Sequence, residues 1–154
     1  MVNLTQLKAE LQADPAGRGY AAHVPHAPGA LADMLNAPTA SMAKPRMITA
    51  RGIMASYGLG PAAGAAFLDK MESLSASVPA IKWAMKFLQA EAGIDVGEPA
   101  TQLMLTSLIG VGGITADEVN GVKAMALQPA SRAEVLFGVG VQITEADVRA
   151  ALEV

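Results

Sequence analysis

Apolar side chains recur at steps of three and four residues along most of the chain, which is the pattern of helices with one buried face. The first such stripe is Leu4, Leu7 and Leu11, and the pair Asp14-Pro15 ends it. The strongest stripe follows Ser77, which we expect to cap that helix. Its apolar positions are Ile81, Met85 and Leu88, with Trp83, Ala84 and Phe87 beside them.

A repeated helix-start signal accompanies these stripes. A capping side chain is followed three residues later by Glu, Gln or Asp, and apolar residues bracket the pair, so each side chain can satisfy free N–H groups of the first turn. The pairs are Asn3 with Gln6, Thr115 with Glu118, Thr144 with Asp147, and Ser131 with Glu134 at the head of a shorter stretch. These pairs predict where four helices begin.

Strand signals are scarce by comparison. Only Val139–Ile143 has the alternating pattern and the β-branched residues of a short strand, and a lone strand has no other strand to pair with. Residues 47–57 have helical spacing, although Gly52 lies inside them, and 38–45 looks like an extended, proline-bounded arm. The sequence therefore predicts an all-α protein of about eight short helices with little or no strand.

Domain organisation follows from length. A chain of 154 residues fits one domain, so we expect a single compact helical domain over 1–154. A composition change near 75–79 marks a candidate junction between two halves. Each half would have fewer than about 80 residues and no metal or disulfide to support it, which argues against separate domains.

Composition narrows the class of function. Apolar residues make up 52% of the chain and charged residues only 16%, against a usual share of roughly 25%, which favours an oligomer or an assembly component. The net charge of -3 and the 4% aromatic content argue against a nucleic-acid partner. The longest weakly polar run, Leu103–Ile114, is too short to span a bilayer, and no secretory signal opens the chain.

Reactive groups are few. The chain has no cysteine, which removes thiolate nucleophiles and thiolate metal ligands. His23 and His26 are three residues apart, but Pro25 disfavours a helix there and no third ligand is near, so a solvated loop is the better interpretation. We predict no catalytic, cofactor-binding or metal-binding residues, no cofactor and no small-molecule substrate.

Two glycine-rich segments superficially resemble phosphate-binding loops. Gly17-Arg18-Gly19 and Gly110-Val111-Gly112-Gly113 follow no predicted strand, and neither matches GxGxxG or ends in GK[ST]. GVGVQ at 138–142 fails the same test. All three are better explained as tight turns in which glycine tolerates positive φ.

Charge is unevenly distributed. No acidic residue lies between Asp33 and Asp69, whereas Lys44, Arg46 and Arg51 do, so this segment is +3 and the rest of the chain is about -6. Such segregation can steer a basic patch onto an acidic neighbour, including another copy of the chain. Lys44, Arg46 and Arg51 are therefore our candidate partner-contact residues; the alternative is an ordinary solvated surface.

Three blocks carry a family resemblance: LKAELQADPAGRGYAAH with LADMLNAP, then ATQLMLTSLIGVGGITADEV, then SRAEVLFGVGVQITEADVRAALE. Together they resemble poorly characterised proteins of tailed bacteriophages and prophages. The blocks cover about half the chain, and Ala37–Ala92 aligns only loosely. The resemblance implies a virion or virion-assembly component with no catalytic residues to carry over, made in the host cytoplasm and localised to the virion.

Three hypotheses follow. The first is a phage structural protein of the tail, neck or capsid that contacts other phage proteins or copies of itself. The second is a cytoplasmic assembly or regulatory factor that binds a protein partner off the particle. The third and weakest is an enzyme of unknown type that uses His23 or His26 with Arg18.

Overall fold

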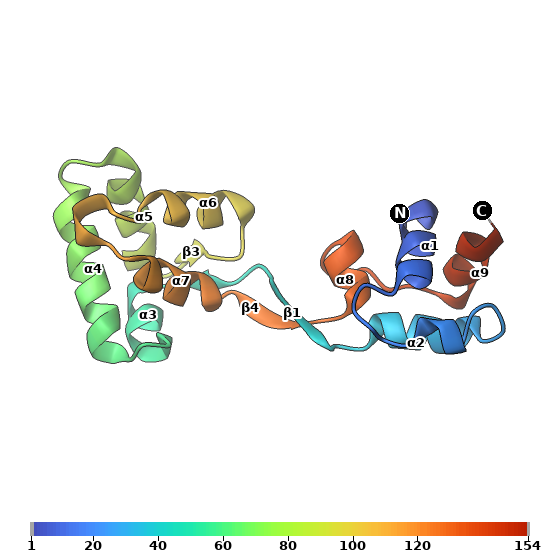
Figure 1. Cartoon of the computed structure of the whole chain (residues 1–154). Coiled ribbons are helices and arrows are strands. Elements are labelled where there is room, and N and C mark those ends of the chain that lie inside the picture. Colours follow the sequence, from blue (N-terminus) through green and yellow to red (C-terminus); the bar gives the residue numbers. More distant parts are fainter. Residues whose placement is uncertain (1, 154) are drawn as a thin grey trace. The chain divides into compact units, whose positions relative to one another are not determined.

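The computed structural model describes residues 2–153, and its contacts divide the chain into two compact units (Figure 1). Unit 1 comprises the residues up to Met42 together with those from Pro129 onward, and unit 2 comprises Ala43–Gln128. Residues 75–79 lie inside unit 2, so the chain does not divide at the candidate junction. Spacing along the sequence could not reveal this division, because unit 1 joins the two ends of the chain. That the units act as one domain stays a prediction.

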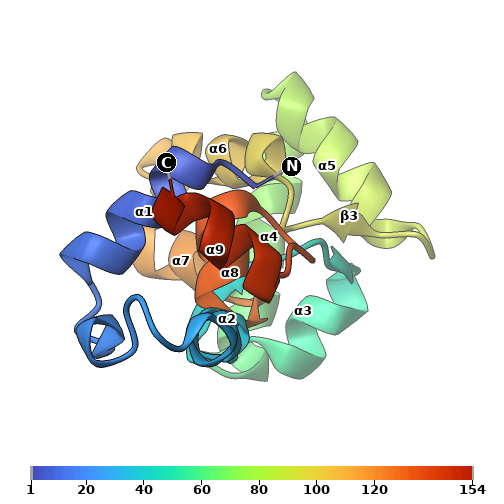
Figure 2. The same cartoon turned by 90° about the vertical axis from the view of Figure 1, so that its right-hand side faces the viewer.

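Unit 1 is built from short helices around a small core. Its elements are α1 (Leu4–Ala13), the 3-10 turn η1 (Tyr20–Ala22), α2 (Pro28–Asn36), α8 (Arg132–Phe137) and α9 (Glu145–Glu153). Helix α9 packs on both α1 and α2, as Figure 2 shows, and α8 packs on α2. Leu7, Tyr20, Leu31, Leu35 and Val148 are fully buried between them. Each helix is too short to be stable alone, so this shared core holds unit 1 together.

Two polar contacts also join the chain ends of unit 1. Arg132 of α8 donates from Nε and Nη2 to the two carboxylate oxygens of Glu10, both at 2.7 Å, and the Glu10 residue is only 5% exposed. Asn36 donates to the carbonyl of Ile143 at 2.7 Å and accepts from its N–H at 2.9 Å. A bidentate guanidinium–carboxylate pair and a reciprocal amide pair both fix orientation as well as distance.

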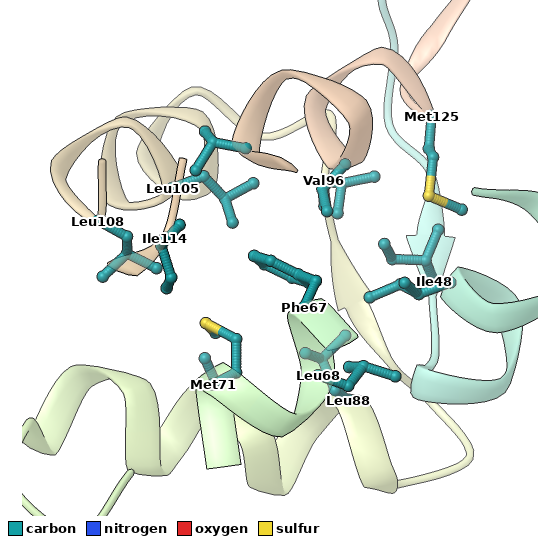
Figure 3. Close-up of a cluster of buried hydrophobic side chains, with 14 of the residues drawn as sticks. Ile48, Phe67, Leu68, Met71, Leu88, Val96, Leu105, Leu108, Ile114 and Met125 are labelled. Carbon is teal, nitrogen blue, oxygen red and sulfur yellow. The ribbon is translucent and has the colours of Figure 1, made fainter. Parts of the chain in front are cut away.

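Unit 2 carries the larger core. Its elements are β2 (Met47–Ile48), α3 (Ala50–Ser56), α4 (Pro61–Ser75), α5 (Pro79–Gln89), β3 (Ile94–Asp95), α6 (Pro99–Ser107), η2 (Val111–Gly113) and α7 (Ala116–Ala124). Helix α4 packs on α3 and α5, while α6 packs on α7. Phe67 and Met71 of α4 lie at the centre, facing Leu105, Leu108 and Ile114 (Figure 3).

Four short strands correct the all-α prediction. The structure is mainly helical, with nine α-helices in the described residues, but β1 (Ala40–Ala43) pairs with β4 (Leu127–Ala130) and β2 pairs antiparallel with β3. The unit boundaries fall within β1 and β4. Strands β2 and β3 join Met47 to Asp95 and Ile48 to Ile94. Two-residue strands have no periodicity to detect, and their partners are far away in sequence.

Val139–Ile143, where the sequence has its strand signals, is not a strand. It forms a turn and an irregular approach to α9, and Gly138 and Gly140 have φ values of 107° and 77°. Residues 47–57 also differ from the prediction, because the helix begins only at Ala50. Its cap is Thr49, whose hydroxyl accepts from the N–H of Gly52 at 3.1 Å. Met47 and Ile48 therefore lie before the helix, where they pair with β3 as a strand.

The predicted caps are largely confirmed. Asn3 accepts from the N–H of Gln6, and Thr115–Glu118 and Ser131–Glu134 form complete capping boxes. At the start of α9, the N–H of Thr144 donates to the Asp147 carboxylate, and the N–H of Asp147 donates to the Thr144 hydroxyl. The prediction for Ser77 is wrong: its hydroxyl donates back to the carbonyl of Leu74, and α5 begins after Val78 with Pro79 in its first turn. Proline suits this position because its fixed φ matches a helix and its missing N–H would have had no intrahelical acceptor.

Candidate protein-contact site

A hollow of about 550 Å³ opens on unit 2 between α7 and the chain that follows α3. From the α3 side it is lined by Ser56, Gly58 and Leu59, and from α7 by Asp117, Asn120, Gly121, Ala124 and Met125, with Arg46 at one edge. The lining mixes apolar and neutral polar groups with one cation and one anion. We call this feature the α3–α7 hollow.

Packing of Tyr57 under α7 sets the shape of the hollow. The Tyr57 hydroxyl donates to the carbonyl of Glu118 at 2.8 Å, and its ring stacks on Phe67 with centroids 6.4 Å apart. A Cβ atom at Gly121 would lie 2.7 Å from the Tyr57 ring, closer than carbon atoms approach. Glycine at this position therefore lets α7 lie directly on the aromatic ring.

Glu118 anchors the start of α7 from two directions. Its carboxylate accepts from the N–H of Thr115 at 2.8 Å and from Lys70 Nζ at 2.8 Å. Burial of the Glu118 carboxyl raises its pKa, but the bonds from Lys70 and Thr115 outweigh this, and the net effect is a lowered pKa. Burial, together with the nearby Glu118 and Asp117 carboxylates, raises the pKa of Tyr57. Glu118 is thus held as an anion and Tyr57 as a neutral donor.

Arg46 is one of the three predicted contact residues, and the structure ties it into unit 2. Its guanidinium Nη1 donates to the carbonyl of Met125 at 2.6 Å, just past the end of α7. Its own N–H donates to the Asp95 carboxylate at 2.8 Å. The Arg46 residue is nevertheless exposed. Its side chain lines the α3–α7 hollow and is hydrogen-bonded to Met125, which lines the same hollow.

Lys44 and Arg51 have different surroundings. Lys44 is half-buried, and its N–H donates to the carbonyl of Ala126 at 3.0 Å. Arg51 lies exposed in the first turn of α3. Of the three, only Arg46 lines the α3–α7 hollow. A contact role for Lys44, Arg46 and Arg51 stays a prediction.

Exposed apolar side chains, which the sequence prediction did not place, gather on unit 2. Eight of the ten large apolar residues that are at least 40% exposed in residues 2–153 belong to it. They are Met47, Met54, Leu59, Trp83, Phe87, Leu103, Ile109 and Leu127. Apolar spacing identified the helices that carry four of them, Met54, Trp83, Phe87 and Leu103, but not which side of each helix faces solvent.

His23, His26 and the Gly17-Arg18-Gly19 segment lie in unit 1. Arg18 lines a second hollow of about 490 Å³ with Ala16, Met34, Ala37 and Thr39, and neither His23 nor His26 lines it. The residues from 2 to 153 contain no group of three His, Asp or Glu side chains placed to hold a metal ion. Nor does any helix within those residues have the length and apolar character to cross a bilayer.

The interpretation of Gly17-Arg18-Gly19 as a turn is confirmed. Gly17 and Gly19 have φ values of 62° and 83°, and the Asp14 carboxylate accepts from the N–H groups of Arg18 and Gly19, both at 2.7 Å. The N–H bond from Arg18 is the main reason why the pKa of Asp14 is lowered. A phosphate would need the same N–H groups, and an anion already occupies them. Gly110, Gly112, Gly113, Gly138 and Gly140 also have positive φ, as expected of tight turns.

Comparison with protein-family models, curated proteins and solved structures finds no match to this chain. The resemblance to tailed-phage proteins therefore rests on the sequence blocks alone.

Proposed function

We propose that the chain is a non-enzymatic structural component of a tailed-phage particle, associated with its tail, neck or capsid, that acts through protein–protein contacts. The observation that supports a contact role most directly is the gathering of exposed apolar side chains on unit 2. Exposed apolar side chains favour contact with a partner, because covering them removes apolar area from water. The resemblance of three sequence blocks to phage proteins supports the particle as the location.

The α3–α7 hollow is the proposed contact point. Leu59 is 57% exposed and Ala124 is exposed in the lining, so an apolar side chain of a neighbour that enters the hollow has apolar groups to contact there. Asn120 and Ser56 offer hydrogen-bond groups at the edge. A buried apolar anchor surrounded by polar contacts is the arrangement that concentrates binding energy in protein interfaces.

The test is mass spectrometry of purified particles from cells that encode the chain. We expect it in the particles in stoichiometric amount, and absence from mature particles would contradict the proposal. If it were found in lysates on a phage structural protein but never in particles, the off-particle assembly factor would be the better hypothesis.

A pair of variants locates the contact. Leu59→Ser combined with Ala124→Glu alters two exposed positions of the hollow, so folding is retained while incorporation into particles falls. Val139→Ser is the matched control, because Val139 is 50% exposed in unit 1 and lines no part of the hollow. Equal incorporation of both variants would show that the hollow is not the contact point.

A further inference from the structure

Helix α5 presents an aromatic and basic face to solvent. Trp83 is 56% exposed and Phe87 is 53% exposed, one turn apart, and Lys82 and Lys86 are exposed beside them. The opposite side of the helix is buried in the unit 2 core through Ile81, Ala84, Met85 and Leu88. We call Lys82, Trp83, Lys86 and Phe87 the α5 face.

The α5 face has the composition of a binding surface. Trp83 is the one tryptophan of the chain, and Nζ of Lys86 lies 4.3 Å from its ring centroid, which orders both side chains. Within residues 2–153, neither Lys82 nor Lys86 forms an ion pair with a carboxylate. Aromatic residues are enriched at the energetic centres of interfaces, whereas an exposed tryptophan without a partner gains nothing for folding.

Charge identifies the kind of surface that complements this face. The exposed positions of α5 carry two lysines and no carboxylate, so two copies of the α5 face repel each other. Unit 1, in contrast, has seven carboxylates and four basic side chains, which gives it a net charge of -3. Unit 2 has seven carboxylates and seven basic side chains and therefore no net charge. Asp33 of α2 and Glu153 of α9 are exposed carboxylates in unit 1 that form no ion pair within the described residues.

We propose that the α5 face binds unit 1 of a second copy of this chain, with Trp83 and Phe87 as apolar anchors and Lys82 and Lys86 opposite its carboxylates. The contact is heterologous, because the two surfaces differ, so it builds a ring or an open row of copies rather than a two-fold dimer. This inference rests on the proposed function as a contact protein and specifies one of its partners as the chain itself.

Sedimentation velocity over a concentration series of the full chain tests the inference. The sedimentation coefficient should rise with concentration, and emission of Trp83 should shift to the blue as its ring leaves water. Because lysine–carboxylate pairs at an interface rim are screened by salt, association should weaken by roughly tenfold at about 0.5 M NaCl. A chain that stays monomeric with unshifted emission at every concentration would overturn the inference.

Surface variants identify the two sides of the contact. Trp83→Ser with Phe87→Ser should weaken association by roughly tenfold or more, as expected for interface anchors, and Asp33→Lys with Glu153→Lys should do the same. Leu103→Ser, at an exposed position on α6, is the control and should associate normally. Mixing the two double variants should give a 1:1 dimer, because only one complementary pair of surfaces remains. Association that survives either double variant would contradict the proposed geometry.

Trp83 emission in the presence of vesicles that contain anionic lipid tests the alternative of membrane binding, since a face of lysines and aromatic side chains can also lie on a membrane surface. A blue shift seen with vesicles but not with rising protein concentration would overturn self-association. Particle mass spectrometry tests the proposed function independently: a self-associating chain absent from particles contradicts only that function, and a monomeric chain present in particles contradicts only this inference.

Discussion

The buried ion pair between Glu10 and Arg132 leads to the sharpest stability prediction. Arg132→Met removes two donors that lie 2.7 Å from the Glu10 oxygens and leaves a carboxylate whose side chain is only 4% exposed. Breaking a buried pair by removing one partner costs about 3–5 kcal/mol, because the remaining charge cannot be solvated. The Arg132 side chain is 22% exposed, so water can enter the space it vacates, and we expect the lower end, about 3 kcal/mol.

The assay is urea unfolding followed by far-UV circular dichroism, with thermal melting as a second measurement. A loss of about 3 kcal/mol corresponds to a fall in Tm of roughly 6–12 °C if the 154-residue chain unfolds as one domain, and of roughly 12–24 °C if unit 1 unfolds by itself. The control is Arg149→Met on α9, which removes the same side chain from an ion pair with Glu145 whose members are 65% and 51% exposed. Exposed pairs contribute about 0–1 kcal/mol, so this control should unfold almost as the parent does.

A double substitution separates the buried charge from lost packing. Glu10→Leu combined with Arg132→Met removes both charges and leaves apolar side chains of similar size, which should restore stability to within about 1 kcal/mol of the parent. The reasoning is refuted if Arg132→Met is as mild as Arg149→Met, or if the double variant is no more stable than Arg132→Met alone.

Two further predictions concern unit 2. Gly97→Ala should cost at least about 2 kcal/mol in thermal melting, because the added Cβ would lie 1.9 Å from the Lys44 carbonyl oxygen, whereas Gly58→Ala, with nothing within 4 Å, should change stability by less than about 0.5 kcal/mol. The pKa of Glu118 is lower in the folded chain than its ordinary value of 4.5, so its contribution to stability is complete above that pH and is lost as the pH falls below it. Acid unfolding of Glu118→Gln should therefore depend less on pH below 4.5 than that of the parent, and an unchanged profile would contradict this assignment.

Local features of the fold could be predicted from the sequence because their causes are local. A capping box needs two side chains three residues apart, so Thr115 with Glu118 and Ser131 with Glu134 can be recognised directly. Glycine turns such as Gly17-Arg18-Gly19 are similarly self-contained, although the part that Asp14 plays was not predicted. These features fix where helices begin and where the chain turns, but not which helices meet.

Long-range features could not be predicted because their partners are distant in sequence. Strand β2 consists of two residues, and its pairing with β3 joins Met47 to Asp95. Apolar spacing alone placed Met47 and Ile48 in a helix, since it cannot register a strand partner so far away. The bond from Arg46 to the Met125 carbonyl is of the same kind, because its partners lie 79 residues apart.

The high apolar content of the chain favours an oligomer or an assembly component, and the structure shows where its exposed apolar side chains lie. If they were spread evenly, these side chains would divide between the units roughly by size; instead eight of ten are in unit 2, which carries no net charge. Covering exposed apolar groups removes apolar area from water, which favours contact. Unit 1 has the converse character, with a net charge of -3 and few exposed apolar groups. Under the proposed self-association, a contact between α5 of one copy and unit 1 of another joins basic groups to carboxylates, whereas a contact between two unit 1 surfaces would bring like net charges together.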